Sequence, residues 1–401
     1  MNFVFDLIYM KNLVLILFYI FCFQLSAQTV YVEDRKIFVD DQEYRINGIC
    51  YARGEGNGEN SGYTFNDDIP LLVDANINTI RTYAAITNSA ELNAFANAGI
   101  KVIMMLNENS YTWYVNQYKN HPAILMWEFG NEFNYHPEWF GNNIQNWYNV
   151  LENCASTVKS IDPNHPVSTG HGEVPNAQAL NSCPSVDVWG MNVYRWLSPD
   201  SAIDELAAQT DKAMYISEAG ADSFNSNSNS ENQAQQAQAT EIILNAIIEK
   251  SDLCVGVTLF EFCDEWWKAG NPNQQDIGGF ANAIPYDNYA NEEYWGIVTR
   301  DREPKQSYYV VKDIYESTSL SINDNNLRIS IYPNPVSDGF INLVNHSNEP
   351  LEIEVFDLNG RKVIYQKSIF DTIDVSVLSK GIYTLKLSRQ GMSDIKKLII
   401  K

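Results

Sequence analysis

Basic residues are scarce in this sequence of 401 residues, where 27 Lys and Arg stand against 50 Asp and Glu and the net charge is −23 at pH 7. The acidic excess lies before residue 328, because residues 328–401 hold 10 Lys and Arg and 8 Asp and Glu. Such a surface repels nucleic acid and anionic membranes, so neither is an expected partner. It suits a neutral polysaccharide better than a polyanion, although solubility alone would account for the same charge.

Cysteine and histidine are also rare. The chain has 6 Cys and 5 His, and neither a CxxC nor an HExxH motif occurs. If Cys22 is removed with an N-terminal leader, an odd number of cysteines remains, which excludes complete pairing within the chain. Cys50 and Cys263 could meet, but free buried thiols are the favoured interpretation. We expect no metal site and no cofactor.

Long apolar runs are absent beyond the N-terminus. There, Lys11 precedes an apolar stretch over residues 13–23, and Ala27 follows at a small-residue cleavage position. This order is typical of a secretory signal peptide, which we place at residues 1–27. The stretch is too short for a stable membrane span. The expected location is therefore outside the cell or on its surface.

From residue 44 onward, short apolar runs alternate with longer amphipathic stretches, which is the pattern of repeated βαβ units. Eight such units predict an α/β fold, a (β/α)8 TIM barrel, as a catalytic domain over residues 28–317. A hairpin over residues 30–41 is expected to close its bottom. The expected strands are 44–51, 79–83, 102–106, 124–128, 167–169, 188–193, 214–217 and 255–260, and the clearest helices are 67–75, 89–98, 144–160 and 232–250.

The pattern changes near the C-terminus. Residues 318–327 are rich in Ser and Asn and are expected to form a linker. Beyond them, alternation of period two with turns at Asn359-Gly360 and Lys380-Gly381 predicts a small all-β sandwich over residues 328–401. Its expected strands are 329–332, 340–344, 351–357, 362–367, 382–387 and 396–400.

Two glutamates follow the ends of expected strands. Glu132 comes after the fourth strand and Glu218 after the seventh, and in a TIM barrel both positions lie at the C-terminal face that carries active sites. Cleavage of a glycosidic bond needs two carboxyl groups, one to protonate the leaving oxygen and one to attack the anomeric carbon or activate water. The distance between the two groups decides between retention and inversion, and sequence spacing does not supply it.

Residues 118–132 read YKNHPAILMWEFGNE. This segment resembles the acid/base signature of glycoside hydrolase family 2, a clan A family of retaining enzymes. The resemblance implies that Glu132 is the acid/base, that Asn131 binds the sugar 2-hydroxyl, and that Glu218 is the nucleophile. The segment 78–83, NTIRTY, lacks the His of the galactosidase and glucuronidase branches and looks more like the β-1,3-glucanosyltransferases of family 72.

Further side chains at strand ends are candidates for substrate contact. Arg81 would hold the charge of Glu218 by hydrogen bonds, unless it forms a purely structural ion pair. Tyr194 could hydrogen-bond Glu218, as in clan A relatives, or lie on the rim. The remaining candidates are Trp196 as a sugar platform, Phe262 or Trp266 beneath the sugar at the cleavage point, and Tyr51 at the rim.

Other acidic residues compete with this pair. Glu128 lies four residues before Glu132, and the motif places it deeper in the barrel. Glu261, Asp264 and Glu265 follow the eighth strand and are expected to serve loop structure or substrate hydroxyls. The connection over residues 264–294 would decide how open the cleft is. It would therefore also decide whether the enzyme cleaves at chain ends (exo) or within chains (endo).

The C-terminal domain carries four motifs in order, which are IYPNPVS at 331–337, VFDLNGR at 355–361, LSKGIYTL at 378–385 and KKLIIK at 396–401. They closely resemble the type A sorting domain of the type IX secretion system. The resemblance implies export across the outer membrane, with the secretion machinery as a partner. A carbohydrate-binding module is the alternative, but this domain has no Trp to offer a sugar.

Together these features predict a secreted retaining β-glycoside hydrolase that cleaves or transglycosylates a β-linked polysaccharide, with β-glucan first. A β-mannanase, a β-galactosidase or another family 2-like glycosidase is the alternative. A non-catalytic carbohydrate-binding protein on the same scaffold is a further alternative.

Overall fold

The computed structural model describes residues 28–52, 62–282, 284–322, 330–332, 334–337, 339–344, 350–358, 360–369, 372–389 and 392–401. The expected signal peptide at 1–27 lies outside these residues. The chain divides into two compact units after Glu316. In the part that the structure describes, no helix is long and apolar enough to cross a membrane.

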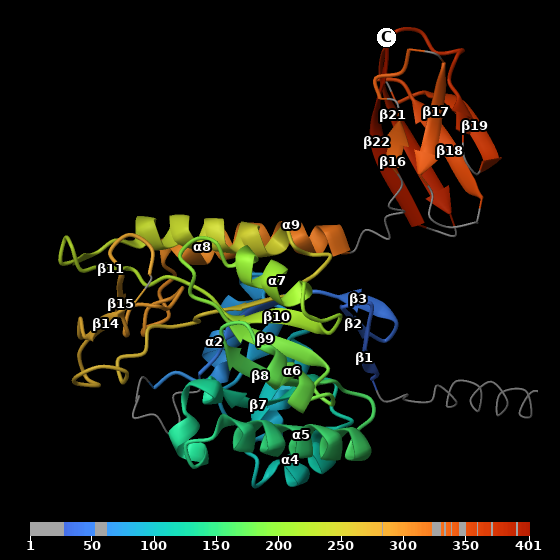
Figure 1. The fold of residues 1–401 in the computed structure, drawn as a ribbon. Helices are drawn as coiled ribbons and strands as arrows, with labels where there is room; N and C mark the ends of the chain where they lie inside the picture. Colours follow the sequence, from blue (N-terminus) through green and yellow to red (C-terminus); the bar gives the residue numbers. More distant parts are fainter. Residues whose placement is uncertain are drawn as a thin grey trace, which may run out of the picture. The chain divides into compact units, whose positions relative to one another are not determined.

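Eight parallel strands form a closed barrel in the first unit (Figure 1). They are β4 (Ile46–Cys50), β5 (Thr79–Arg81), β6 (Lys101–Leu106), β7 (Ile124–Asn131), β8 (Val167–Gly172), β9 (Val188–Asn192), β10 (Ala213–Glu218) and β13 (Gly256–Leu259). The order around the barrel is β10-β13-β4-β5-β6-β7-β8-β9. Each lies within two or three residues of an expected strand, so the predicted TIM barrel is confirmed.

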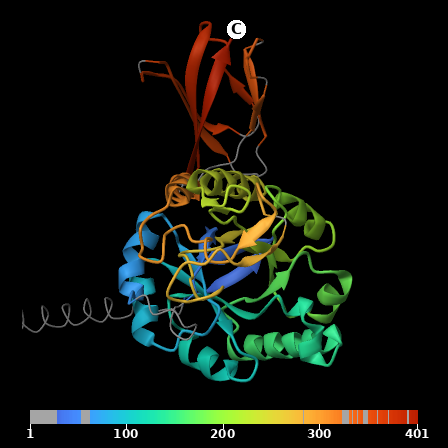
Figure 2. The same ribbon diagram turned by 90° about the vertical axis from the view of Figure 1, so that its left-hand side faces the viewer.

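One helix follows each barrel strand, and together they surround the strands (Figure 2). The helices are α2 (Phe65–Asp74), α3 (Ser89–Asn97), α4 (Tyr111–Tyr118), α5 (Ile144–Ile161), α6 (Ala177–Ser182), α7 (Asp200–Ala207), α8 (Gln233–Ile248) and α9 (Gln306–Ile322). Thr64 and Asn143 are examples of N-cap side chains that accept a backbone N–H of the first turn. Such caps fix where a helix begins, because they accept hydrogen bonds from backbone N–H groups that the first turn leaves unpaired.

The bottom of the barrel is closed by the sheet β1 (Val30–Glu33), β2 (Lys36–Val39) and β3 (Gln42–Tyr44). Val30 and Ile37 pack with Ile46, Leu125 and Val188 from the first residues of barrel strands. The expected hairpin is thus a three-stranded meander. Its third strand is short and polar, so it carries little periodic signal.

Two small hairpins stand on the opposite face, at the C-terminal ends of the barrel strands. The segment after β10 forms β11 (Phe224–Asn225) with β12 (Ser230–Glu231), and the segment after β13 forms β14 (Gly279–Ala281) with β15 (Tyr289–Asn291). Figure 2 looks onto this face. The second hairpin lies in the connection over residues 264–294 that the sequence analysis expected to shape the cleft.

The second unit packs two antiparallel sheets around one apolar core. One sheet is β16 (Ser330–Tyr332), β17 (Phe340–Val344) and β20 (Thr372–Asp374), and the other is β18 (Leu351–Phe356), β19 (Lys362–Ile369), β21 (Gly381–Arg389) and β22 (Met392–Ile400). Ile341 and Ile373 from the first sheet meet Ile353 and Leu385 from the second. The sandwich contains one strand that the sequence did not predict, β20, which is too short to show an alternating pattern.

Helix α9 continues to Ile322, so the first residues of the expected linker are helical rather than extended. The buried side chain of Thr318 explains part of this, because the inner face of the helix still packs there. Residues 323–327 lie outside the described residues. The five described cysteines are buried and none of them is in a disulfide, so the Cys50–Cys263 pairing left open by the sequence does not form.

Candidate active site

Glu218 is the last residue of β10, and three donors converge on its carboxyl group. Oε1 accepts from Arg81 Nη1 at 2.9 Å and from the Tyr83 hydroxyl at 2.8 Å. Oε2 accepts from the Tyr194 hydroxyl at 2.9 Å. All three of these hydrogen-bond partners are donors, so both carboxyl oxygens of Glu218 act as acceptors.

Arg81 ends β5, is completely buried, and links three strands. Its Nε donates to Glu128 Oε1 at 2.7 Å, its Nη1 to Glu218, and its Nη2 to Asn131 Oδ1 at 2.8 Å. Burial disfavours the charged form of Arg81 and by itself lowers its pKa. The surrounding anionic groups, Glu128 foremost, outweigh this and raise the pKa of Arg81 above its ordinary value. Arg81 therefore orients the candidate nucleophile and is also a structural ion pair.

Glu128 lies inside the barrel and has no solvent exposure. Besides Arg81, it accepts from Ser168 Oγ at 3.1 Å and from the Tyr215 hydroxyl. Its carboxylate is thus fully used as the counter-ion of Arg81. It is the deep residue that the sequence motif suggested, and it does not reach the mouth of the barrel.

Glu132 follows β7 with φ at 56°, in the left-handed region. Its N–H donates to the Gly170 carbonyl at 2.8 Å, which fixes this unusual backbone conformation, and its Oε1 accepts from Asn192 Nδ2 at 3.1 Å. Burial, and then the like charge of Glu218, raise the pKa of Glu132 to about 7. A carboxyl group of this kind can hold a proton near neutral pH and release it to a substrate.

Asn131 is oriented by two donors to the same oxygen. Its Oδ1 accepts from Arg81 Nη2 and from Asn192 Nδ2 at 3.0 Å. Two donors on one side define which amide atom is the oxygen. The amide N–H groups therefore point away from Arg81, where they can donate to a sugar hydroxyl.

Asn192 and Tyr83 belong to the site, although the sequence did not single them out. Asn192 ends β9, contacts Asn131 and Glu132, and accepts from Ser217 Oγ at 2.6 Å. Tyr83 comes two residues after β5 and donates to Glu218. The available signal was position: both are polar side chains at the ends of barrel strands, in segments already quoted for Arg81 and Tyr194.

An aromatic wall adjoins Glu218. Phe260 follows β13 and is half-buried, and its ring lies 5.3 Å from that of Trp295 and 6.4 Å from that of Tyr194. Tyr194 and Trp295 are 5.5 Å apart. Phe260 and Tyr194 are both half-buried, and Lys268 Nζ lies 4.2 Å from the centre of the Phe260 ring.

Two expected substrate contacts are corrected. Phe262 is only 2% exposed and packs against Tyr51 and other core residues, so it cannot lie beneath a sugar. Tyr51 is 4% exposed and donates to Asp68 Oδ2 at 2.7 Å, so it does not lie on the rim. Strand alternation would place Phe260 and Phe262 on the same side. Because β13 ends at Leu259, the backbone no longer follows strand geometry there, and Phe262 packs in the core while Phe260 contacts Tyr194 and Trp295.

Two further candidates lie on loops of the same face. Trp196 follows β9, has φ at 53° and is 43% exposed. Trp266 is half-buried in the segment after β13, and the Arg300 guanidinium lies 4.7 Å from its ring centre. Trp196 can present its ring to a ligand, whereas Trp266 is partly covered by Arg300.

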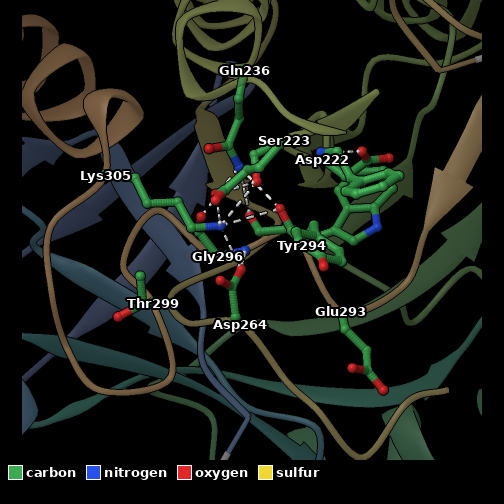
Figure 3. A network of polar contacts seen from close by, with 12 residues as sticks. Asp222, Ser223, Gln236, Asp264, Glu293, Tyr294, Gly296, Thr299 and Lys305 are labelled. Carbon is green, nitrogen blue, oxygen red and sulfur yellow. Dashed lines mark hydrogen bonds and ion pairs between the residues drawn. The ribbon is translucent and has the colours of Figure 1, made fainter. Parts of the chain in front are cut away.

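Buried polar contacts hold the segments behind the wall (Figure 3). Lys305 Nζ lies 2.6 Å from Asp264 Oδ1, and Gln236 Nε2 donates to several carbonyl groups, including those of Tyr294 and Gly296. Glu261 and Glu265 are paired with Lys268, at 2.8 and 2.9 Å. The acidic residues after β13 therefore serve loop structure, and Glu218 and Glu132 remain the carboxyl pair at the mouth.

Within the described ranges, no group of three or more His, Cys, Asp or Glu is arranged to hold a metal ion. The chemistry that the described side chains offer is proton transfer by Glu132 and attack or charge stabilisation by Glu218.

Comparison with known families gives two matches. Residues 108–320, more than half of the chain, match the glycosyl hydrolases family 2, TIM barrel domain. Residues 330–401 match the secretion system C-terminal sorting domain.

Individual relatives share parts of the chain. The mannan endo-1,4-beta-mannosidase F of Aspergillus clavatus is 36% identical over 88 residues, which are 20% of this chain and 19% of that protein. A GH2 beta-galacturonidase from Eisenbergiella tayi has a TM-score of 0.53 at 22% identity and covers 72% of this chain and 54% of its own. The structure of a beta-D-glucuronidase of Dictyoglomus thermophilum has a TM-score of 0.55 at 17% identity. This match covers 72% of this chain and 53% of the glucuronidase chain. The chain spans about half the length of these structures and about a fifth of the mannosidase.

The raised pKa of Glu132 predicts a pH-dependent cost in stability. The folded state binds this proton more tightly than an ordinary glutamate, so the free energy of unfolding falls as pH rises from 4.5 to about 7. The Glu132→Gln variant has no carboxyl group at this position, so its free energy of unfolding should not show this fall with rising pH. The variant should gain on the order of 2 kcal/mol over the wild type between pH 5 and pH 8, after allowance for partial exposure.

Urea unfolding at several pH values measures this difference. Glu241→Gln, at an exposed position of α8, is the matched control and should show no such trend. A pH-independent difference for Glu132→Gln would contradict the assignment of its environment.

Proposed function

Because this chain belongs to glycosyl hydrolase family 2 through its TIM-barrel domain, we propose that it cleaves a β-linked polysaccharide by a retaining mechanism with two carboxyl groups. The observation that carries the proposal is the contrast between two glutamates at the C-terminal ends of barrel strands β7 and β10. Glu218 lies among three donors, while burial and a like charge favour the protonated form of Glu132. Residues 28–317 are the catalytic domain in this proposal.

In the first step, the Glu218 carboxylate attacks the anomeric carbon while the bond from that carbon to the leaving oxygen breaks. Glu132 gives its proton to the leaving oxygen. In the second step, Glu132 takes a proton from water, whose oxygen attacks the same carbon and releases Glu218. A sugar hydroxyl in place of water gives transglycosylation.

The surrounding residues have supporting roles in this scheme. Arg81, Tyr83 and Tyr194 keep Glu218 aimed at the anomeric carbon, and Asn131 donates to the sugar 2-hydroxyl. Asn192 holds the Glu132 carboxyl group in place. Phe260 provides the apolar surface for the sugar at the cleavage point, and Trp196 provides a second one further out.

The charges near the site favour a neutral sugar. Arg81 is held by Glu128 and Glu218, and Lys268, which lies 4.2 Å from the Phe260 ring centre, is held by Glu261 and Glu265. A sugar carboxylate bound there would have to displace one of these anions. Among neutral polymers, the identity with the mannosidase favours β-mannan first. The likeness of residues 78–83 to family 72 keeps β-glucan as the second candidate.

A panel of polysaccharides tests the substrate class. The wild type should release reducing ends from β-mannan or from a β-1,3-, β-1,4- or mixed-linkage glucan, and little from polygalacturonate or a glucuronan. The reason is that the cations near the site are already paired. Preferential cleavage of a uronic acid polymer would contradict this proposal, and binding without cleavage of any polymer would favour the non-catalytic alternative.

Substitutions of the two glutamates test their roles. Glu218→Ala should lose at least about 10⁴-fold in kcat on every substrate, because the attacking group is gone. Glu132→Ala should lose about 10²–10⁴-fold on a polysaccharide but much less on a 2,4-dinitrophenyl glycoside, whose leaving group needs no proton in the first step. Wild-type activity on the polysaccharide should fall as pH rises through about 7, where Glu132 loses its proton.

Glu138→Gln, an exposed glutamate near Glu132 in sequence, serves as the control and should keep wild-type activity. Equal losses of Glu132→Ala on both substrates would contradict its role as the acid. Proton NMR of the first product, with the β-anomer expected, tests retention.

We also propose that residues 328–401 direct export by the type IX system, with the matched sorting domain as support. Deletion of residues 330–401 should leave active enzyme in the periplasm of a host with this system, whereas the full chain reaches the cell surface or the medium. Fractionation followed by activity assay measures the difference. Equal release of both forms would contradict the proposal.

A further inference from the structure

An exposed aromatic ring lies three residues beyond Glu132. Tyr135 ends the short helix η1 (Phe133–Tyr135) and is 52% exposed. By contrast, the aromatic rings next to Glu218 are largely covered, since Trp295 is 3% exposed and Tyr194 donates its hydroxyl to the carboxylate. An exposed ring beside a candidate acid needs an explanation, because aromatic side chains normally bury much of their surface.

The ring of Tyr135 is held in place by the end of β8. A Cβ atom on Gly172 would lie 2.2 Å from Tyr135 Cε2, so the ring rests directly on the glycine backbone. Asn134 pins the same segment, with Nδ2 donating to the Gly172 carbonyl at 3.0 Å and Oδ1 accepting the Gly172 N–H at 2.8 Å. The exposed face of Tyr135 is therefore a fixed surface rather than a mobile side chain.

Charged groups that can bind hydroxyls lie next to this ring. Glu173, directly after Gly172, accepts from Arg195 Nε at 2.8 Å, and Arg195 also bonds Glu205 at 3.0 Å. Burial, followed by the charges of Glu132 and Glu173, raises the pKa of the Tyr135 hydroxyl to about 12. Because Arg195 precedes Trp196, the ion pair also brings the loop that carries this second exposed ring to the side of the mouth where Tyr135 lies.

The strand order decides which part of a substrate would reach Tyr135. In the closed barrel, β7 stands four places from β13, which is directly opposite in a ring of eight strands. The wall of Phe260 and Trp295 follows β13, whereas Glu132 and Tyr135 follow β7. A sugar held against the wall beside Glu218 would have its glycosidic oxygen toward Glu132, so the leaving group would continue toward Tyr135.

We infer that the Tyr135 ring on Gly172, flanked by the Glu173–Arg195 ion pair, is a binding site for the leaving-group sugar of a β-linked polysaccharide. The inference rests on the proposed function and extends it. Sugar rings have an apolar face that stacks on a fixed aromatic surface, and their hydroxyls bond to charged side chains at its edge. The enzyme then acts on bonds that have sugar on both sides, and the same site accepts the incoming sugar in transglycosylation.

The test compares substrates that do and do not occupy the site. The kcat/KM values are measured for β-mannosyl fluoride and β-glucosyl fluoride, whose leaving group is a single atom and does not fill the site, and for β-1,4-manno- and β-1,3-gluco-oligosaccharides of two to six units. Tyr135→Ala should lower kcat/KM on oligosaccharides of the cleaved series by about tenfold, as expected for loss of an aromatic platform, and leave kcat/KM on the glycosyl fluoride unchanged. Tyr135→Phe should keep most of the activity, because the ring remains.

Two more variants separate binding from folding. Gly172→Ala leaves Tyr135 in the chain but pushes its ring aside, so it should show the same selective loss on oligosaccharides. Tyr309→Ala removes a tyrosine that is 55% exposed on the outer helix α9, and it should change neither substrate.

The outcomes distinguish this inference from the proposed function. Wild-type cleavage of a glycosyl fluoride tests the attack by Glu218 and does not involve Tyr135. If the wild type cleaves both substrate types and Tyr135→Ala lowers both equally, or lowers neither, the leaving-group site is overturned while the proposed function stands. A selective loss with longer substrates supports it.

Discussion

The buried guanidinium of Arg81 is the contact on which the whole site depends. A cation without solvent exposure persists only if anions and acceptors satisfy it, and Arg81 has Glu128, Glu218 and Asn131. These bonds join β5, β7 and β10 across the barrel. They also require Gly170 in β8, because a Cβ atom there would lie 2.3 Å from Arg81 Nη2. Loss of one partner would cost on the order of 3–5 kcal/mol, since it leaves a buried charge uncompensated.

The asymmetry between the two glutamates follows from this contact. Glu218 accepts hydrogen bonds from Arg81 and from the hydroxyls of Tyr83 and Tyr194. The hydrogen bond that the structure gives Glu132 comes from the side-chain amide of Asn192. Glu132 therefore experiences burial and the charge of Glu218 with little compensation. Two residues of the same type thus lie in different electrostatic environments, because one guanidinium is aimed at one of them.

The segment after β13 contains little regular structure, yet it carries two of the three rings of the aromatic wall, Phe260 and Trp295. Buried polar groups take the place of backbone ladders there. Lys305 pairs with Asp264, and Gln236 binds the carbonyl groups around Trp295. Burial in a low dielectric makes such contacts strong and makes any missing partner costly, so these segments have a defined position.

Much of this protein could be predicted from its sequence. The eight barrel strands are predictable because apolar runs of strand length alternate with amphipathic stretches, and Glu132 and Glu218 are recognisable because polar residues after such runs lie on one face. The direction of individual side chains beyond a strand end is not encoded in that periodicity. Phe262 and Tyr51 therefore turn into the core, Phe260 contacts Tyr194 and Trp295, and Asn192 and Tyr83 complete the site. The barrel and the two glutamates are therefore predictable from local patterns. Their hydrogen-bond partners are not, because contacts between distant strands depend on register and closure that no local pattern records.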